Sequence, residues 1–567
     1  MMDTGHTTMN AARPSVFIEE ISFSSGQTVS LGATDKIVIV GPNNCGKSQS
    51  LRDIHVLAAK PGSREALTIT GVKISKIGSK QDFLQYAENH GTMHDETCRI
   101  NDWRFHLRNA ANAWSIENLQ NGLTQGYVKR IDADGRLRIC NQQPSIRPDE
   151  QREKPQQILY FDPELMARIS SLFKKSFGLD LIINYQGGSV IPIHVGDVSS
   201  VTNPDRVSAE YVEAVTRNPP LHTQGDGIKS YAGILFEAIV AERDITLLDE
   251  PEAFLHPPQM RRLGETLANE LSKQLFVATH SSDILRGFLE ATRGGVRILR
   301  LQRKSNFNSV SEASPDTIRE LWSTPKLRYS NALEGIFHEQ TIICEDDSDC
   351  RLFQAVDDHL VNSGEISNID IHFVPAGGKS GVAKIASVLR KIGVPIKAIF
   401  DIDLLSKKDD VEAVFCAFGG EWSNLETAWN SLYTAVTSGI KPKSPSEIKQ
   451  DIVDIIQQSL SDDIPKGKIT EAMKQSSSWG IVKKGGKAVI PNGDAQKYFQ
   501  EVIESLSSVG IFVIEQGEAE NFLREVGKHG PKFVNELLEK FDIGGEKLAE
   551  LRQFIIKVHD GSSCVLP

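Results

Sequence analysis

The sequence predicts an α/β protein built from two successive domains. Apolar runs of strand length alternate with segments of helical periodicity in two separate stretches, at residues 1–325 and 335–567. This alternation is typical of sheets whose strands are mostly parallel. The chain has 567 residues, more than one hydrophobic core normally supports, so two or three domains are expected.

Composition excludes several classes of protein. No apolar run reaches the ~18 residues that a membrane helix needs, and the N-terminal stretch MMDTGHTTMNAARPS lacks the order of a signal peptide. Seven cysteines without metal-ligand spacing suit a reducing compartment, so we expect a cytoplasmic protein without membrane contact. The formal net charge of −11 argues against a general nucleic-acid coat but allows a local basic groove.

The first domain can be followed element by element. Residues 60–215 mix short strand-like pieces, such as VKRIDADGRLRI at 128–139, with polar turns, and we interpret them as an insertion or arm. The other expected elements are strands at 16–23 and 36–40, a helix at 48–57, a helix from Ile228, a strand at 244–250, a helix near 258–272 and a strand at 274–280.

The stretch GPNNCGKS, beginning at Gly41, fits the phosphate-binding pattern G-x-x-x-x-G-K-[ST]. It follows an apolar strand and precedes a helix, where backbone N–H groups can face phosphate oxygens. Gly41 and Gly46 allow the backbone to curl, Lys47 reaches the terminal phosphates, and Ser48 can hold Mg²⁺. Asn44 belongs to the same predicted nucleotide-binding set.

A second stretch, LLDEPEAFLHP, supplies the catalytic partners of such a loop. Asp249 ends an apolar strand, where it can bind Mg²⁺ directly or through water. Glu250 lies beside it and can polarise the attacking water as a general base. His280 ends the next predicted strand, where it could contact the γ-phosphate. ATP and Mg²⁺ are therefore the expected cofactors of the first domain.

These motifs together resemble the ATPase heads of the ABC and RecF-like class. In that class, a glycine-containing signature loop at a helix start completes the ATP site of a second protomer. TQGDGIKSYAGIL lies at the corresponding place, with Gly225 and Gly227 before the helix, although it departs from the usual L-S-G-G core. The resemblance implies that two heads enclose two nucleotides, and hence at least a homodimer.

An acidic cluster opens the second domain. IICEDDSDC carries four carboxylates within five positions, and such close like charges need solvation or a cation. Its flanks predict a strand that ends at Glu345 and an amphipathic helix that begins at Asp349. Further on, Asp401 and Asp403 follow an apolar run, and on a strand they would point to the same face. Two carboxylates there are costly unless they share a cation.

A glutamate after one strand and Asp-x-Asp after a later one resemble the TOPRIM fold of topoisomerases, primases and a group of nucleases, here over residues 338–425. The resemblance implies that Glu345, Asp349, Asp401 and Asp403 bind Mg²⁺ or Mn²⁺ and that a pair of ions cleaves a phosphodiester. The family usually has glycine after the glutamate. This chain has Asp346 instead, so the sequence leaves open the backbone geometry of the turn after Glu345.

Other residues near this predicted site allow more than one role. Glu518 and Glu520 lie at a predicted helix start, where acids are favoured in any case, but Glu520 resembles a further metal ligand of TOPRIM nucleases. PAGGKSG at 375–381 fits a phosphate-approaching turn and a plain surface loop equally well. A lysine that assists catalysis is expected, and the sequence does not choose among Lys483, Lys484, Lys487, Lys528 and Lys532.

An ATPase head with a long insertion, then TOPRIM, then a helical region at 430–567, resembles the OLD (overcoming lysogenization defect) family of bacterial nucleases. That family includes the nuclease of the Gabija defence system and retron-associated effectors. The resemblance implies an ATP-regulated, metal-dependent DNA endonuclease that acts against phage. Whether a regulatory protein or nucleic acid also binds stays open.

A rival from another class is a RecF-like ATP-dependent DNA clamp whose TOPRIM module has lost cutting activity. The residue Asp346 keeps this alternative open. A topoisomerase ranks last, because none of the nine tyrosines has a context that marks a strand-attacking residue.

Overall fold

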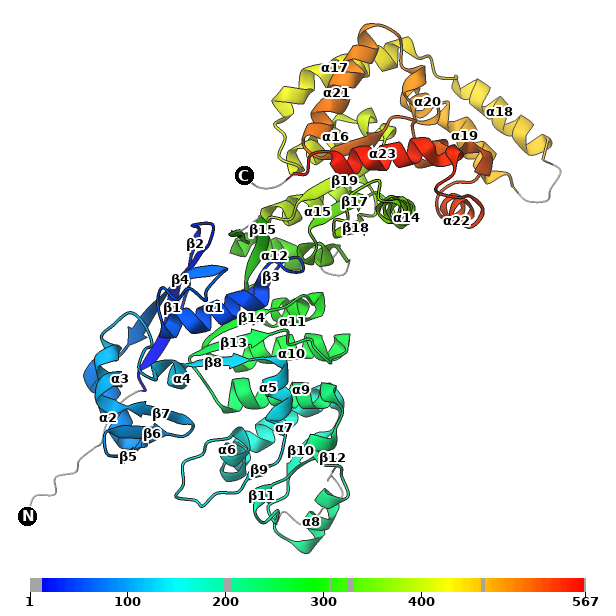
Figure 1. Ribbon diagram of the computed structural model, residues 1–567. Coiled ribbons are helices and arrows are strands. Elements are labelled where there is room, and N and C mark those ends of the chain that lie inside the picture. The colour runs from blue at the N-terminus through cyan, green and yellow to red at the C-terminus, as the bar shows by residue number, and fades with distance from the viewer. Residues whose placement is uncertain (1–12, 198–204, 305–306, 324–330, 460–463, 565–567) are drawn as a thin grey trace, which may run out of the picture. The chain divides into compact units, whose positions relative to one another are not determined.

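The chain folds into two α/β units, residues 1–323 and 324–567, and each has its own sheet of mainly parallel strands (Figure 1). The computed structural model describes residues 13–197, 205–304, 307–323, 331–459 and 464–564. The predicted boundary near residue 325 falls within 324–330, outside the described residues. The predicted α/β class is confirmed.

A six-stranded sheet forms the centre of the first unit. Its strand order is β16-β15-β3-β14-β13-β8, and only the pair β15–β16 is antiparallel. Because the other strands are parallel, the segments that follow β3, β13 and β14 meet at one edge of the sheet. The six strands are β3 (Lys36–Val40), β8 (Val128–Ile131), β13 (Ile245–Asp249), β14 (Gln274–Ala278), β15 (Arg297–Lys304) and β16 (Phe307–Glu312).

Helices follow these strands, and the sequence predicts the two that come after β3 and β13. α1 (Lys47–Ala59) comes after β3, α10 (Pro257–Glu270) after β13, and α11 (Ser282–Thr292) after β14. α9 (Asp226–Ile234) precedes β13 and continues into a π-helical stretch, Leu235–Val240, instead of one uniform helix. The last helix of the unit is α12 (Pro315–Ser323).

The segment 60–215, predicted as an insertion or arm, also supplies strands to the sheets of the first unit. β4 (Ile69–Ile77) pairs with β1 (Ser15–Phe23), which also pairs with β2 (Thr28–Ser30), while β8 joins the central sheet. The remaining elements are α2 (Lys80–His90), β5 (Thr92–His94), β6 (Thr97–Ile100), β7 (Trp103–His106), α3 (Leu107–Trp114), α4 (Leu123–Tyr127), α5 (Ala133–Arg138), β9 (Gln143–Pro144), α6 (Pro155–Phe161), α7 (Pro163–Phe177), β10 (Asp180–Ile183), β11 (Val190–Ile191), β12 (Ile193–Gly196) and α8 (Ala209–Thr216).

The stretch 128–139 is only partly the strand that the sequence suggests, because β8 ends at Ile131 and α5 follows. The Asp132 side chain accepts the N–H group of Gly135 at 2.9 Å. Capping a free N–H group in this way favours a helix start over continued strand. α5 then packs against α9 at Gly233, where a β-carbon would lie 2.0 Å from the carbonyl oxygen of Arg136.

A four-stranded parallel sheet, in the order β18-β17-β19-β20, forms the second unit. Its strands are β17 (Gln340–Cys344), β18 (Ile371–Pro375), β19 (Ile396–Asp401) and β20 (Ile511–Ile514). β20 is a strand within the region 430–567, which the sequence predicts as helical, and corrects that prediction at this point. Its four residues are all buried against β19, a pairing between distant segments that leaves no periodic signal in so short a run.

Helices surround this second sheet and share its core. The apolar faces of α14, α22 and α23 pack with residues of β17, β19 and β20. Among the described residues, no helix is both long and apolar enough to cross a membrane. The helices are α14 (Asp347–Ser363), α15 (Lys379–Lys391), α16 (Lys408–Ala417), α17 (Trp422–Gly439), α18 (Pro445–Gln457), α19 (Lys466–Lys474), α20 (Ser478–Gly485), α21 (Asp494–Ser508), α22 (Pro531–Lys540) and α23 (Ala549–Asp560).

Candidate nucleotide and metal sites

The predicted phosphate-binding loop forms one wall of a cavity of about 780 Å³. Gly41 (φ 139°) and Gly46 (φ 96°) have left-handed backbone conformations, and a β-carbon at Gly41 would lie 2.3 Å from the Leu301 carbonyl oxygen. Glycine is therefore required at the first position of the loop. Lys47 Nζ donates to the carbonyl oxygen of Gly41 at 2.8 Å. The predicted site residues that line the cavity are Asn44, Gly46, Lys47, Ser48, Glu250 and His280.

Asp249 ends β13 beside this loop. Burial raises the pKa of its carboxyl group, and a hydrogen bond from the Ser48 hydroxyl acts in the opposite direction. Its Oδ1 atom is buried and has no hydrogen-bond partner among the described residues. A hydroxyl and a carboxylate oxygen are hard ligands of the kind that Mg²⁺ prefers. Ser48 and Asp249 thus fit the predicted magnesium site of a bound nucleotide.

The backbone of Glu250 is held by groups that the sequence analysis missed. Glu250 has a φ of 44°, a conformation that residues with a β-carbon rarely adopt. Its N–H group donates to the Ala278 carbonyl at 2.9 Å. The carbonyl oxygens of Asp249 and Glu250 accept hydrogen bonds from the Arg136 guanidinium at 2.9 and 2.7 Å. No motif marks Arg136, because it lies more than a hundred positions before the residues it contacts.

His280 lies two positions beyond the end of β14, where the sequence predicted the last residue of the strand. Its N–H group donates to Glu252 Oε1 at 2.7 Å, and its Nδ1 atom lies 3.0 Å from the same oxygen. Glu252 is 4% exposed, and burial raises the pKa of its carboxyl group. Glu252 therefore orients His280 toward the cavity. Its place in DEPE, two positions after Glu250, was an available but unused signal.

Gly225 and Gly227, the predicted signature residues, lie at the start of α9. A β-carbon at Gly227 would stand 2.6 Å from the carbonyl oxygen of Phe254, so the helix start approaches the segment after Glu250 closely. Neither glycine lines the cavity of its own chain's phosphate-binding loop. Their role toward a second protomer stays a prediction.

The four predicted acids of the second unit lie at or shortly after the carboxyl ends of two strands of its sheet, β17 and β19. Glu345 directly follows β17, Asp349 lies in the first turn of α14, and Asp401 ends β19. Asp403 lies in a 3₁₀ helix, Ile402–Ser406, so the expectation that it shares a strand face with Asp401 is wrong. The strand stops there because the Ile402 N–H group donates to the carbonyl oxygen of Gly517 at 2.8 Å instead of continuing a ladder.

Two lysines join these acids into one cluster. Lys483 Nζ lies 3.0 Å from Asp401 Oδ2 and 3.0 Å from Asp403 Oδ2, and Lys379 Nζ lies 2.8 Å from Asp403 Oδ1. The turn at 375–381 thus directs a lysine into the cluster and is more than a plain loop. Three other candidate lysines form ion pairs elsewhere: Lys484 with Glu471, Lys487 with Glu515 and Lys528 with Glu536.

Electrostatics within the cluster favour a bound cation. Burial, together with neighbouring negative charges, raises the pKa of Glu345 to about 7, that of Asp349 to about 7 and that of Asp401 to about 6. Burial also acts to raise the pKa of Asp403, but Lys483 and Lys379 outweigh it and hold that pKa below its usual value. Glu345 Oε1 is buried and lacks a hydrogen-bond partner among the described residues. These oxygens fit Mg²⁺ or Mn²⁺.

Asp346, the departure from the family's glycine, causes no strain. Its φ of −131° and ψ of 164° are extended values that any residue adopts. Its N–H group donates to Asp349 Oδ2 at 3.3 Å across the start of α14. The turn therefore keeps Glu345 and Asp349 in place without a glycine.

Glu520 lies in a 3₁₀ helix, Ala519–Val526, shortly after β20. Its negative charge contributes to raising the pKa of Asp349 and of Asp401, after burial as the main cause. One of its oxygens already accepts the N–H group of Gly530 at 2.8 Å. Glu520 therefore borders the cluster, and its role as a ligand stays a prediction.

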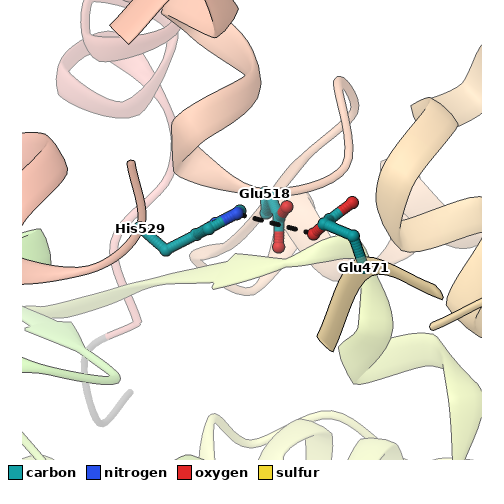
Figure 2. A group of neighbouring side chains, drawn as sticks. All are labelled: Glu471, Glu518 and His529. Atoms are coloured by element: carbon teal, nitrogen blue, oxygen red, sulfur yellow. Dashed lines mark ion pairs between the residues drawn. The ribbon is translucent and has the colours of Figure 1, made fainter. Parts of the chain in front are cut away.

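Figure 2 shows a second group of side chains, Glu471, Glu518 and His529. Their potential ligand atoms lie within 4.8 Å of one another. His529 Nδ1 lies 3.6 Å from Glu520 Oε1. Lys474 Nζ, however, lies 2.8 Å from Glu471 and 2.9 Å from both oxygens of Glu518. Lys484 Nζ also lies 3.1 Å from Glu471 Oε2, so two ammonium groups offset the charge of the two carboxylates. We therefore interpret the group as an ion-pair network that joins α19 to the segment after β20.

Two family models match the chain. Residues 74–286 match "AAA domain, putative AbiEii toxin, Type IV TA system", and residues 336–403 match "Overcoming lysogenization defect protein-like, TOPRIM domain". A curated relative, the Old nuclease of Escherichia phage P2, is 23% identical over 289 residues, which is 49% of this chain. The match covers 42% of that relative, so the chain spans about two fifths of its length.

The solved structures that match part of the chain include heads of SMC proteins, at low sequence identity and low TM-score. The SMC head bound to the C-winged helix domain of ScpA is 13% identical, with a TM-score of 0.34, over 53% of this chain and 98% of that one. The SMC head domain from Thermotoga maritima is 14% identical, with a TM-score of 0.26, over 52% of this chain and 99% of that one.

Proposed function

We propose that this chain, which matches an AAA-type ATPase model and an OLD-like TOPRIM model, is an OLD-family protein and an ATP-regulated, divalent-metal-dependent DNA endonuclease. The observation that carries the proposal is the cluster of Glu345, Asp349, Asp401 and Asp403 with Lys379 and Lys483. The proposal includes a role in defence against phage, in the cytoplasm where phage DNA is replicated, supported by the family resemblance.

The residues of the cluster divide the chemical work. Bound Mg²⁺ or Mn²⁺ ions would activate water and stabilise the leaving oxygen of a phosphodiester. Lys483 keeps Asp401 and Asp403 oriented through its two ion pairs, and Lys379 holds the other oxygen of Asp403. Both ammonium groups are also placed to attract the DNA backbone, because a phosphate is their natural counter-ion.

The proposed ATP site controls cutting. Lys47 and the loop N–H groups bind the phosphates, Ser48 and Asp249 hold Mg²⁺, and Glu250 polarises the attacking water. His280, oriented by Glu252, faces the terminal phosphate. Gly225 and Gly227 of a second protomer close the site, so the proposed active species is a homodimer or a higher homo-oligomer.

The decisive experiment incubates supercoiled plasmid with the purified chain and Mg²⁺ or Mn²⁺. We expect nicking or linearisation that disappears in Asp401→Ala. Asp347→Ala is the matched control, because Asp347 lies between Glu345 and Asp349 in sequence but is 75% exposed and pairs with Arg351. Cleavage that persists in Asp401→Ala at the wild-type rate would refute the proposal.

The clamp alternative rests on the substitution at Asp346, and the backbone geometry there does not favour it. Asp346 has extended φ and ψ values, so the loss of glycine leaves the turn unstrained. In the plasmid experiment, the clamp would appear as tight DNA binding with no nicking under any metal condition.

A further inference from the structure

We propose that Arg136 is a positioning residue of the ATP site and that α5 couples the helix α9 to Glu250. The proposal deepens the function given above, since it concerns the regulation of the same nucleotide site. It rests on one buried side chain that contacts the catalytic segment and on one close contact between two helices.

The side chain of Arg136 is aimed at the backbone around the proposed general base. Arg136 is 0% exposed, and its two terminal nitrogens donate to the carbonyl oxygens of Asp249 and Glu250 at 2.9 and 2.7 Å. These carbonyls flank the φ of 44° at Glu250, a value that needs support from its surroundings. With the Glu250 N–H group bound to Ala278, both peptide groups of Glu250 are held in place.

The charge of Arg136 also has a reason to be buried there. A guanidinium taken out of water is costly unless hydrogen bonds and opposite charges compensate it. The carboxylates of Glu252, Asp249, Glu250 and Asp132 are the negative charges that act on it. Glu252 in turn binds His280. The guanidinium therefore interacts with Glu250, the proposed general base, and with Glu252, the residue that orients the histidine.

The backbone of the same residue contacts α9. The Arg136 carbonyl oxygen would lie 2.0 Å from a β-carbon at Gly233, so the two helices touch with no side chain between them. A second link joins Cys140, just after α5, to α9, because its Sγ atom lies 3.1 Å from the Lys229 carbonyl oxygen. A shift of α9 must therefore displace α5, and with it the guanidinium that holds Glu250.

This arrangement gives a route for regulation. α9 begins at Gly225 and Gly227, the residues proposed to meet the nucleotide of a second protomer. When that contact forms or breaks, α9 moves relative to the sheet, and Arg136 transmits the movement to the position of Glu250. The geometry thus makes hydrolysis sensitive to the assembly of two heads.

The test compares Arg136→Met with Arg138→Met, a control on the same helix whose side chain is exposed. We expect Arg136→Met to lower the kcat of ATP hydrolysis by roughly 10- to 100-fold, the cost of a misplaced catalytic group. Binding of a fluorescent ATP analogue should stay within about twofold of wild type, since Arg136 does not line the cavity. Millimolar guanidinium should restore part of the rate in Arg136→Ala, a rescue that a merely structural role would not produce.

Hydrogen exchange without nucleotide supplies a second readout that does not need ATP hydrolysis. Exchange of the peptide covering residues 249–254 should rise in Arg136→Met and in Gly233→Ala, and should stay unchanged in Arg138→Met. Unchanged exchange in the first two variants would overturn the proposal, as would a loss of nucleotide affinity equal to the loss of kcat. If the wild type binds no ATP, the proposed function fails, while the exchange comparison still decides whether Arg136 holds Glu250.

Discussion

At the scale of single residues, charge and burial indicate which side chains belong to the two candidate sites. Lys483 and Lys379 reach the acids of the cluster, whereas neighbouring lysines pair with glutamates elsewhere. Arg136 holds the backbone of Glu250. Glu252 holds the ring of His280, which is a second proposed member of the ATP site. All of these contacts join residues that are far apart in sequence or unmarked by any motif.

Lys483→Met should lower the rate of plasmid cleavage by more than about 100-fold, because Asp401 and Asp403 lose the charge that orients them. Lys484→Met is the matched control, since the adjacent Lys484 pairs with Glu471 outside the cluster. Initial rates of nicking at saturating Mg²⁺ measure the effect. Equal rates for the two variants would contradict the assignment of Lys483.

The raised acid pKa values predict how stability depends on pH. Glu345, Asp349 and Asp401 have folded pKa values of about 7, 7 and 6, above their unfolded values, so between about pH 4 and 7 the folded state binds more protons than the unfolded state. Their contribution to stability is therefore present at low pH and is lost as pH rises through these values. We expect the metal-free second unit to become less stable over that window.

Divalent ions should reverse that loss, because they bind the deprotonated acids. The rise in Tm on adding Mn²⁺ should be larger at pH 8 than at pH 5.5, as read by differential scanning fluorimetry. Glu345→Gln removes one buried charge, so without metal at pH 8 it should raise Tm by roughly 2–4 °C. A Glu345→Gln protein that melts below wild type under those conditions would show that the carboxylate is not under electrostatic strain.

Glu252→Gln should lower the kcat of ATP hydrolysis by roughly tenfold while leaving nucleotide binding near the wild-type value. The reason is that the neutral amide retains the size of Glu252 but weakens the hold on the His280 ring. The initial rate of phosphate release at saturating ATP measures this loss of kcat. A parallel loss of ATP affinity would indicate damage to the whole loop instead.

At the scale of elements, short segments place these residues. α5 exists because Asp132 caps its first turn, and it carries Arg136 to the end of β13. β20 adds a fourth strand beside β19, which brings Glu520 to the edge of the acid cluster. Both elements are brief, and both lie in stretches that the sequence analysis assigned differently.

Asp132→Ala should destabilise the first unit by about 1 kcal/mol, the usual cost of losing an N-cap. Asp134→Ala is the control, because Asp134 lies in the same turn, is exposed and does not cap the helix. Urea denaturation followed by circular dichroism measures the difference. Equal midpoints for the two variants would mean that the cap does not contribute to the stability of α5.

At the scale of the whole molecule, two α/β units in one chain suggest that nucleotide state and cutting are coupled. The cleavage rate of the wild type should change several-fold on adding ATP, and that of Lys47→Ala should not change, because its loop cannot hold the phosphates. Asp401→Ala should still hydrolyse ATP. A wild-type cleavage rate that is the same with and without ATP would remove ATP control from the proposal.

The proposed assembly of two or more copies of the chain is also a property of the whole molecule. Glu250→Gln, which should bind ATP without hydrolysing it, is expected to form dimers or larger oligomers in the presence of ATP, as measured by light scattering. Adding a second substitution, Gly225→Trp, should prevent this, because a β-carbon at Gly225 meets no atom of its own chain within 4 Å and the bulky side chain blocks the proposed contact with the other protomer's nucleotide. Oligomers that form equally well without ATP would place the interface elsewhere.

The sequence by itself determined the α/β class, the phosphate-binding loop, the Asp249–Glu250 pair and the order of an ATPase-type domain before a TOPRIM domain. These features depend on spacing within a few residues, where strand and helix periodicity and turn chemistry operate directly. Only the tertiary structure decided which lysines join the acids, where Asp403 lies, that Asp346 is unstrained, and that Arg136 and Glu252 contact Glu250 and His280 of the proposed ATP site. Lys483 and Asp403 are 80 positions apart, and Arg136 and Asp249 are 113 apart. Contacts over such separations arise from packing and leave no periodic trace in the chain.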